Sequence, residues 1–274
     1  MKILLKKILF SISVIKITGL CFLFVFISNR PLLAEQNESA AQNPNINIVW
    51  SDNNGRSEQI YFSSYMNNNW TSPVQLSDGA NFVFHPISSS GDDRKIWVVW
   101  TKRDKNGNFL QFSVYNKSQW SQQKQIKTDI NDNRAVTIVV DKSNMPWIAI
   151  EGIGNSYSDI YWTRWNGREW EVPTKAHADN KVPDVHPALS IDAFGNIILS
   201  WQTYANGMYV TVSQTWDGQS WKKISPKADA ISKKKMIQNK KRLPVLPKFI
   251  KTPEKATLFL KTQDGVESIP LSLL

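Results

Sequence analysis

A repeat of about 50 residues is the feature that most constrains the fold of this chain. The repeat ends on a short turn that an aromatic residue opens and a tryptophan closes five positions later. The closing residues are Trp70, Trp120, Trp170 and Trp221. A second register has the same steps of 50, 50 and 51 residues, at Trp50, Trp100, Ile150 and Trp201. Two registers with one period indicate four copies of one structural unit.

Each copy has the pattern of four short strands joined by tight turns. The second copy shows all four, at 85–88, 95–100, 109–115 and 120–127. The turns between them are rich in Asn and Gly, which adopt positive φ at little cost. Repeats of this length with four strands each are typical of propeller blades. We therefore predict an all-β fold, a β-propeller of about four four-stranded blades, with five blades or a partial ring as alternatives.

The repeats occupy only the middle of the chain. Residues 1–34 have the basic start and apolar run of a signal peptide, with an uncleaved anchor as the alternative. Residues 35–44 are a polar linker, 45–225 the propeller repeats, and 226–255 a basic linker rich in Pro and Lys. Residues 256–274 resemble a hairpin, which would close the ring by completing the first blade. This order predicts an exported protein, either periplasmic, secreted or held at the cell surface.

The positive charge belongs to the two ends of the chain. The net charge is +10, but residues 35–225 hold 17 basic and 19 acidic side chains. The repeat region is therefore not predicted to bind nucleic acid. A basic cluster follows it, made of Lys233, Lys234, Lys235, Lys240, Lys241 and Arg242. This cluster is either a solvated linker or a contact for an acidic surface such as anionic lipid or polysaccharide.

No cofactor or metal is predicted. The only cysteine is Cys21, in the leader, so the mature chain would have no disulfide. No group of His, Cys, Asp and Glu has the spacing of transition-metal ligands, and His177 stands alone in a predicted loop. Phosphate-binding loops and nucleophile elbows are also missing from the sequence.

The repeats resemble the sialidase-type, or Asp-box (BNR), propellers over about residues 45–225. The resemblance is carried by Ile60-Tyr61-Phe62-Ser63, by turns such as 165–170, and by His-Pro pairs at His85 and His186. It implies a propeller fold and, in the catalytic members, glycoside hydrolysis. The box itself is degenerate here, because aromatic residues occupy its Asp position. The Arg-Ile-Pro tripeptide of the sialidases is also missing, so no catalytic residue is transferred.

Loops at one end of the blades are the predicted ligand site. The candidates are Asp52, Arg56, His85, Arg103, Asp104, Arg134, Glu151 and His186. Glu151 is also the one weak catalytic candidate, because the other copies have Ser51, Thr101 and Gln202 at its position. His85 and His186 occupy equivalent places before a proline, which favours a structural role for both.

These observations favour a binding protein over an enzyme. Aromatic residues beside Asn, Asp and Arg suit the faces and hydroxyl groups of sugars. We expect an exported, non-catalytic propeller that binds a glycan or a protein partner. A sialidase-like exo-glycosidase is one alternative, and a structural or assembly scaffold is another.

Overall fold

The computed structural model describes residues 46–53, 55–79, 82–130, 132–153, 156–224, 250, 256–262 and 265–270. The strands are β1 (Ile46–Asn53), β2 (Glu58–Met66), β3 (Asn69–Trp70), β4 (Val74–Gln75), β5 (Phe82–Ser90), β6 (Ile96–Asp104), β7 (Gly107–Tyr115), β8 (Lys124–Ile126), β9 (Asn133–Val140), β10 (Pro146–Ile153), β11 (Ser158–Arg164), β12 (Thr174–Lys175), β13 (Asp184–Ile191), β14 (Ile197–Ala205), β15 (Met208–Trp216), β16 (Trp221–Lys223), β17 (Ala256–Thr262) and β18 (Gly265–Pro270). These residues contain no helix, so the predicted all-β class is confirmed for them. In particular, none of them forms a helix long and apolar enough to cross a membrane.

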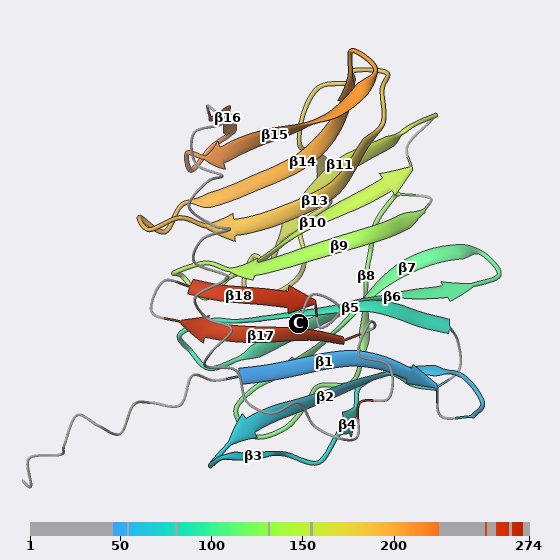
Figure 1. Ribbon diagram of the computed structural model, residues 1–274, viewed down its shortest axis with the longest axis vertical. Helices are drawn as coiled ribbons and strands as arrows, with labels where there is room; N and C mark the ends of the chain where they lie inside the picture. The colour runs from blue at the N-terminus through green and yellow to red at the C-terminus, as the bar shows by residue number, and fades with distance from the viewer. Residues whose placement is uncertain are drawn as a thin grey trace, which may run out of the picture. The chain divides into compact units, whose positions relative to one another are not determined.

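The strands form four antiparallel sheets, one for each copy of the repeat (Figure 1). Sheet 1 has the order β18-β17-β1-β2-β3, and β4 also pairs with β2. Sheets 2, 3 and 4 each hold four consecutive strands, β5–β8, β9–β12 and β13–β16. Each of these three sheets therefore follows chain order, as the repeat predicts.

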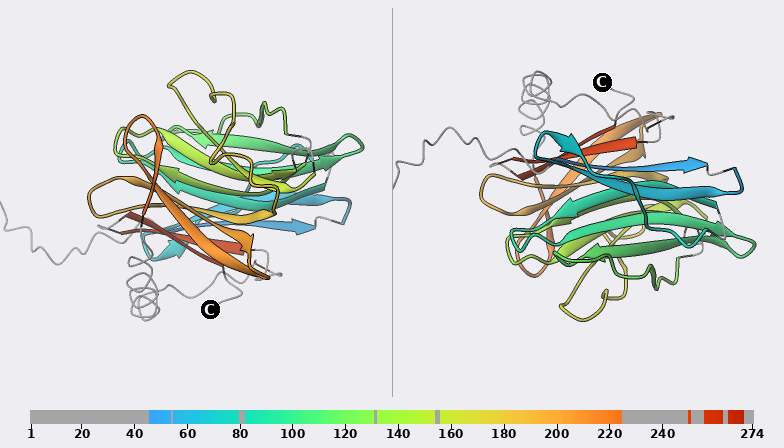
Figure 2. Two further views of the ribbon diagram at one scale, coloured as in Figure 1. Left: turned by 90° about the horizontal axis from the view of Figure 1, so that it is seen from above. Right: turned by 90° about the horizontal axis from the view of Figure 1, so that it is seen from below.

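Sheet 1 differs because its first strand comes from the far end of the sequence. Strand β17 pairs with β1, with Leu258 opposite Ile48, and β18 pairs with β17 (Figure 2). Strand β17 thus has the place that β5, β9 and β13 have in the other sheets. The predicted leader, the polar linker and the basic cluster at 233–242 lie outside the described residues.

The repeated aromatic turns are closed by a backbone bridge and a ring contact. In the third turn, Trp165 and Trp170 form an isolated bridge, and their ring centroids are 5.8 Å apart. Asn166 Oδ1 accepts hydrogen bonds from the backbone N–H groups of Arg168 and Glu169, both at 3.0 Å. Gly167 completes the turn with φ of 100°, which a residue with a side chain rarely adopts. The Asn-Gly pair is therefore the local cause of this turn.

The turn pairs of sheets 2, 3 and 4 pack against aromatic residues of the preceding sheet. Trp170 of sheet 3 lies 5.9 Å from both Trp97 and Phe112 of sheet 2. Trp221 of sheet 4 makes a similar contact at 5.6 Å with Trp162 of sheet 3. Buried aromatic rings of this size contribute much of the energy of a core. The core of the described residues therefore lies between successive sheets.

Candidate functional site

The eight predicted ligand residues lie near corresponding ends of the sheets. The strand registers show this, because Arg103 lies opposite Phe82 in sheet 2 and Gly152 lies opposite Asn133 in sheet 3. In sheet 4, Thr203 lies opposite Asp184. The turns after β1, β6, β10 and β14 and the starts of β5, β9 and β13 therefore belong to the same end, which we call the rim.

Three of the predicted residues are brought together where sheets 2 and 3 meet at the rim. His85 Nδ1 lies 3.3 Å from the backbone oxygen of Arg134, and the Arg103 guanidinium lies over the Phe84 ring at 5.1 Å. Arg103 donates from Nε to Asn108 Oδ1 at 2.8 Å, and Asn108 in turn donates to Asp132. These contacts give Arg103 and His85 partners within the protein.

Glu151 has a structural partner. Its Oε2 accepts a hydrogen bond of 2.9 Å from the backbone N–H of His186. His186 has φ of 55° and lies in a bulge between β13 and β14, so its N–H cannot take part in the regular ladder. The Glu151 side chain, which is buried, therefore fixes the bulge of the next sheet.

The other three predicted residues lie in or beside turns. Asp52 Oδ1 accepts from the backbone N–H of Asn53 at 2.8 Å, and Asp104 Oδ1 accepts from that of Asn106 at 2.7 Å. Arg56 is exposed in the turn between β1 and β2. For Asp52 and Asp104 these contacts are those of turn residues.

A pocket lies between sheets 3 and 4, at a place that the sequence did not indicate. Its volume is about 490 Å³, within the roughly 300–1,000 Å³ of small-molecule sites. Alternating residues of β14, β15 and β16 form one wall, because residues two apart on a strand share a face. The loop after β12 forms the other wall. The lining residues are Ala176, His177, Ala178, Asn180, Trp201, Thr203, Val212, Gln214, Trp221 and Lys223.

Three lining side chains have buried polar atoms without a hydrogen-bond partner, namely His177 Nε2, Gln214 Oε1 and Trp221 Nε1. Gln214 Oε1 is an acceptor and Trp221 Nε1 is a donor. A buried polar atom left unpaired costs about 1–3 kcal/mol, so native proteins keep few of them. Gln214 Oε1 and Trp221 Nε1 are both covered by protein, so a hydroxyl group in the pocket would pair with them only after small rotations of the two side chains. A hydroxyl suits both atoms because it can donate and accept.

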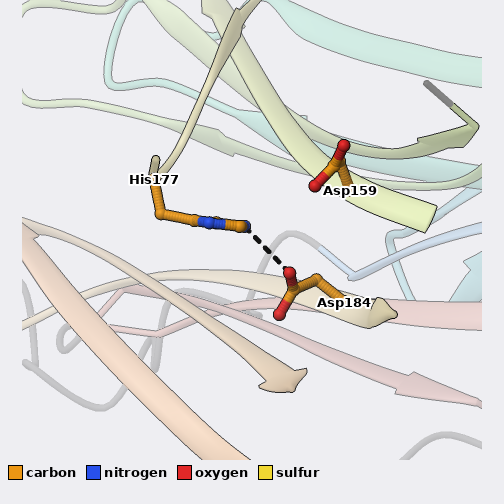
Figure 3. A group of neighbouring side chains, drawn as sticks. All are labelled: Asp159, His177 and Asp184. Atoms are coloured by element: carbon orange, nitrogen blue, oxygen red, sulfur yellow. Dashed lines mark ion pairs between the residues drawn. The ribbon is translucent and has the colours of Figure 1, made fainter. Parts of the chain in front are cut away.

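The wall of the pocket at His177 is held by a buried carboxylate. The His177 ring stacks on Trp201, with centroids 5.3 Å apart and planes at 16°. Asp184, which is fully buried, accepts from Trp201 Nε1 at 3.0 Å and from Asn180 Nδ2 at 2.8 Å. His177 Nε2 lies 3.1 Å from Asp184 Oδ2 (Figure 3). One carboxylate therefore contacts three residues that line the pocket.

A second buried carboxylate, Asp159 of β11, lies near the same end of the His177 ring as Asp184 (Figure 3). Lys175 Nζ donates to it at 2.7 Å and also contacts the exposed Asp179. The hydrogen bond to Asp159, with a second to Asp179, raises the pKa of Lys175 above its ordinary value. The lysine is therefore firmly charged and is the cation that neutralises Asp159.

The sequence missed this cluster because its members are far apart along the chain. The cluster takes Asp159 from β11, His177 from the loop that follows β12, and Asp184 from β13. These residues meet only when sheets 3 and 4 pack together. Ligand spacing within one segment cannot reveal such a group. One signal was present, since Asp184 stands in sheet 4 where Asn133 stands in sheet 3. That change from amide to carboxylate breaks the repeat.

Comparisons with known proteins find similarity in structure only. No family model matches the chain, and no curated protein matches it. A fucose lectin from Kordia zhangzhouensis, solved with methyl-fucoside, is 16% identical at a TM-score of 0.33, covering 51% of this chain and 98% of that one. An endo-arabinase from Bacteroides thetaiotaomicron is 11% identical at a TM-score of 0.39, and the match covers 83% of this chain and 92% of that one. Aleuria aurantia lectin, as a point mutant in complex with alpha-methyl-L-fucoside, is 12% identical at a TM-score of 0.36. This match covers 82% of this chain and 73% of that one.

Proposed function

We propose that this chain is an exported protein of the β-propeller type that binds a glycan, with one sugar residue held in the pocket between sheets 3 and 4. The observation that carries the proposal is a pocket of about 490 Å³ whose lining includes two side chains with unpartnered polar atoms, Gln214 Oε1 and Trp221 Nε1. A ligand that satisfies both needs closely spaced groups that donate and accept. Neighbouring hydroxyl groups on a sugar ring have this property.

The rest of the lining suits a sugar as well. Trp221, which is half-buried, provides aromatic surface for the apolar C–H face of a sugar ring, whereas Trp201 is buried and stacks on His177. Thr203 and Lys223 add polar groups to the same wall. An apolar surface with a few convergent polar groups is the usual composition of a small-ligand site.

The lining favours binding over hydrolysis. Glycosidases place a pair of carboxyl groups beside the bond that they cleave. None of the ten lining residues carries a carboxyl group. The weak catalytic candidate, Glu151, holds the His186 backbone instead. We therefore propose a glycan-binding role without catalysis.

Export and the propeller fold are parts of the same proposal. The basic and apolar pattern of residues 1–34 supports export to the periplasm, the medium or the cell surface. Four successive antiparallel sheets with aromatic turns, three of them in chain order, support a propeller. A protein partner, which the sequence left open, is an outcome of the test below.

The test is binding of the purified protein to a broad glycan array, beside the variant Gln214→Leu. This substitution removes the unpaired oxygen and keeps the volume of the side chain. We expect selective, competable binding by the wild type and a loss of about tenfold or more in the variant, as when one hydrogen bond of about 1.4 kcal/mol is removed.

The matched control is Gln219→Leu, because Gln219 is exposed in the turn before Trp221 and does not line the pocket. It should bind as the wild type does. If the folded wild type bound no glycan, the proposal would be wrong and a protein-binding scaffold would take its place. Equal binding by Gln214→Leu would place the sugar elsewhere.

A further inference from the structure

The His177 ring has a fixed tautomer. Its Nδ1 lies 2.7 Å from the backbone oxygen of Ala178, and a carbonyl oxygen can only accept a hydrogen bond. Nδ1 therefore carries a proton, and in the neutral ring Nε2 has a free lone pair. Nε2 is buried and makes no hydrogen bond. Histidines that bind a metal through Nε2 commonly donate Nδ1–H to a backbone carbonyl in this way.

The surroundings of Nε2 favour positive charge, carried either by a protonated ring in an ion pair with Asp184 or by a bound cation. Nε2 lies 3.1 Å from Asp184 Oδ2, so two lone pairs would face each other if the ring were neutral and nothing lay between them. Asp159 is the second carboxylate at this place, and both carboxylates are buried. Lys175 is shared between Asp159 and Asp179, and it makes no contact with Asp184 among those the structure shows. The buried negative charge around Nε2 is therefore only partly neutralised.

We propose that Asp159, His177 and Asp184 bind a divalent transition-metal ion of the zinc type. One imidazole nitrogen and two carboxylate oxygens are a donor set typical of Zn²⁺, and calcium prefers oxygen ligands alone. The three ligand atoms lie within 4.8 Å of one another. Ligands of one zinc ion lie roughly 4 Å apart at most, because each bond is about 2.0–2.2 Å long. Small rotations of the side chains would close the site (Figure 3).

Outer contacts already orient two of the ligands. The Ala178 carbonyl holds the His177 ring, and Trp201 and Asn180 both donate to Asp184. Such partners are the normal support of metal ligands. Lys175 would leave Asp159 when the ion binds and keep its contact with Asp179. The ammonium group therefore acts as a competitor that occupies part of the site in the metal-free protein.

The ion would also fix one wall of the pocket. His177 lines the pocket and stacks on Trp201, which lines it too. Coordination of Nε2 would hold this stacked pair in one orientation. The metal site does not depend on the proposed glycan, because its ligands were inferred from their own contacts and charges.

The experiment is a titration of the chelator-treated, untagged protein with Zn²⁺ by calorimetry and with Co²⁺ by visible absorption. We expect one ion per chain and a cobalt spectrum of nitrogen and oxygen ligands. His177→Ala and Asp184→Asn should weaken binding by more than the roughly 10–100-fold that the loss of an outer contact costs. Lys175→Met should bind about tenfold more tightly, because a competing charge is removed.

The controls are Asp129→Asn and Lys222→Met. Asp129 is exposed in the corresponding loop between sheets 2 and 3, and Lys222 is exposed on β16 beside the lining residue Lys223. Neither change should alter the affinity. If neither the wild type nor Lys175→Met bound either ion, or if folded His177→Ala bound with wild-type affinity, the metal site would be refuted. Lys175→Met keeps the test valid even where loss of a ligand prevents folding.

The metal and the glycan are measured separately. Binding of Zn²⁺ by a protein that recognises no glycan would support the metal site and refute only the proposed function. Glycan binding by a protein that takes no metal would do the reverse.

Discussion

The interface between sheets 2 and 3 and the interface between sheets 3 and 4 are built from the same repeat, and the pocket described above lies in the second. In the first, a Cβ on Gly152 would overlap the side chain of Ile130, so these two residues fill the space completely. In the second interface, Thr203 of sheet 4 occupies the position that Gly152 has in sheet 3. Asn180 follows the start of β12 by as many residues as Ile130 follows the start of β8, so these two residues are also equivalent. Replacing a close apolar contact by two polar residues leaves room for a ligand.

The two interfaces also differ in one buried polar residue. In sheet 3, Asn133 donates to the backbone oxygens of Asn108 and Ile130, at 2.9 and 3.3 Å. In sheet 4 the corresponding residue is Asp184, which contacts His177, Asn180 and Trp201 instead. A neutral amide satisfied by backbone needs nothing further, whereas a buried carboxylate needs positive charge. A few residue differences between the copies therefore separate a satisfied structural contact from the pocket and its buried charged cluster.

The largest expected effect concerns the turn tryptophans. Trp170→Ala should lower the free energy of unfolding by ~3–5 kcal/mol, because Trp170 packs on both Trp97 and Phe112 in a filled interface. Trp221→Ala should cost less, since one side of Trp221 faces the pocket. Denaturant unfolding of the two variants measures the difference. Equal losses would show that the second interface is packed as tightly as the first.

A smaller effect is expected at Gly152. Gly152→Ala should destabilise the protein by ~1–3 kcal/mol, because the added methyl group meets Ile130 in a filled space. The double variant Gly152→Ala/Ile130→Ala should recover part of that loss. Thermal unfolding of the wild type and both variants gives the answer. A neutral Gly152→Ala would contradict the close contact on which the comparison rests.

The smallest effect is expected in the last turn, where Asp217 stands in the place of Asn166. Backbone hydrogen bonds from Ser220 and Gln219 lower the pKa of Asp217 below its ordinary value. The stabilisation is therefore complete above the unfolded pKa of about 3.9 and is lost as the pH falls through the lower folded pKa. Asp217→Asn should unfold at a slightly lower temperature than the wild type at pH 7, and this difference should shrink at low pH. A constant difference would exclude the charge as its cause.

The sequence predicted the features that recur in every copy of the repeat well, and it predicted the features present in one copy alone poorly. Period and turn chemistry indicated one sheet for each copy, because regular strands depend on local pattern. Glu151 was a candidate because the other copies have no acidic residue at its position, and it is buried in the structure. Its partner, the backbone N–H of His186, could not be inferred from the sequence. The Asp159, His177 and Asp184 cluster stayed hidden, because its members meet across two sheets and a loop. Asn180 and Asp184 both differ from the residues at the equivalent positions of the other copies. Taken together, these two differences would have indicated the interface between sheets 3 and 4.

We propose that the open interface between sheets 3 and 4 binds a glycan. The most direct test transfers the filled interface onto the open one, with the double variant Asn180→Ile/Thr203→Gly, which copies Ile130 and Gly152. Its signal on a glycan array is compared with that of the wild type, after circular dichroism has shown that both are folded. We expect the folded variant to lose binding of the sugars that the wild type binds. Retention of the same sugars at wild-type strength would contradict it.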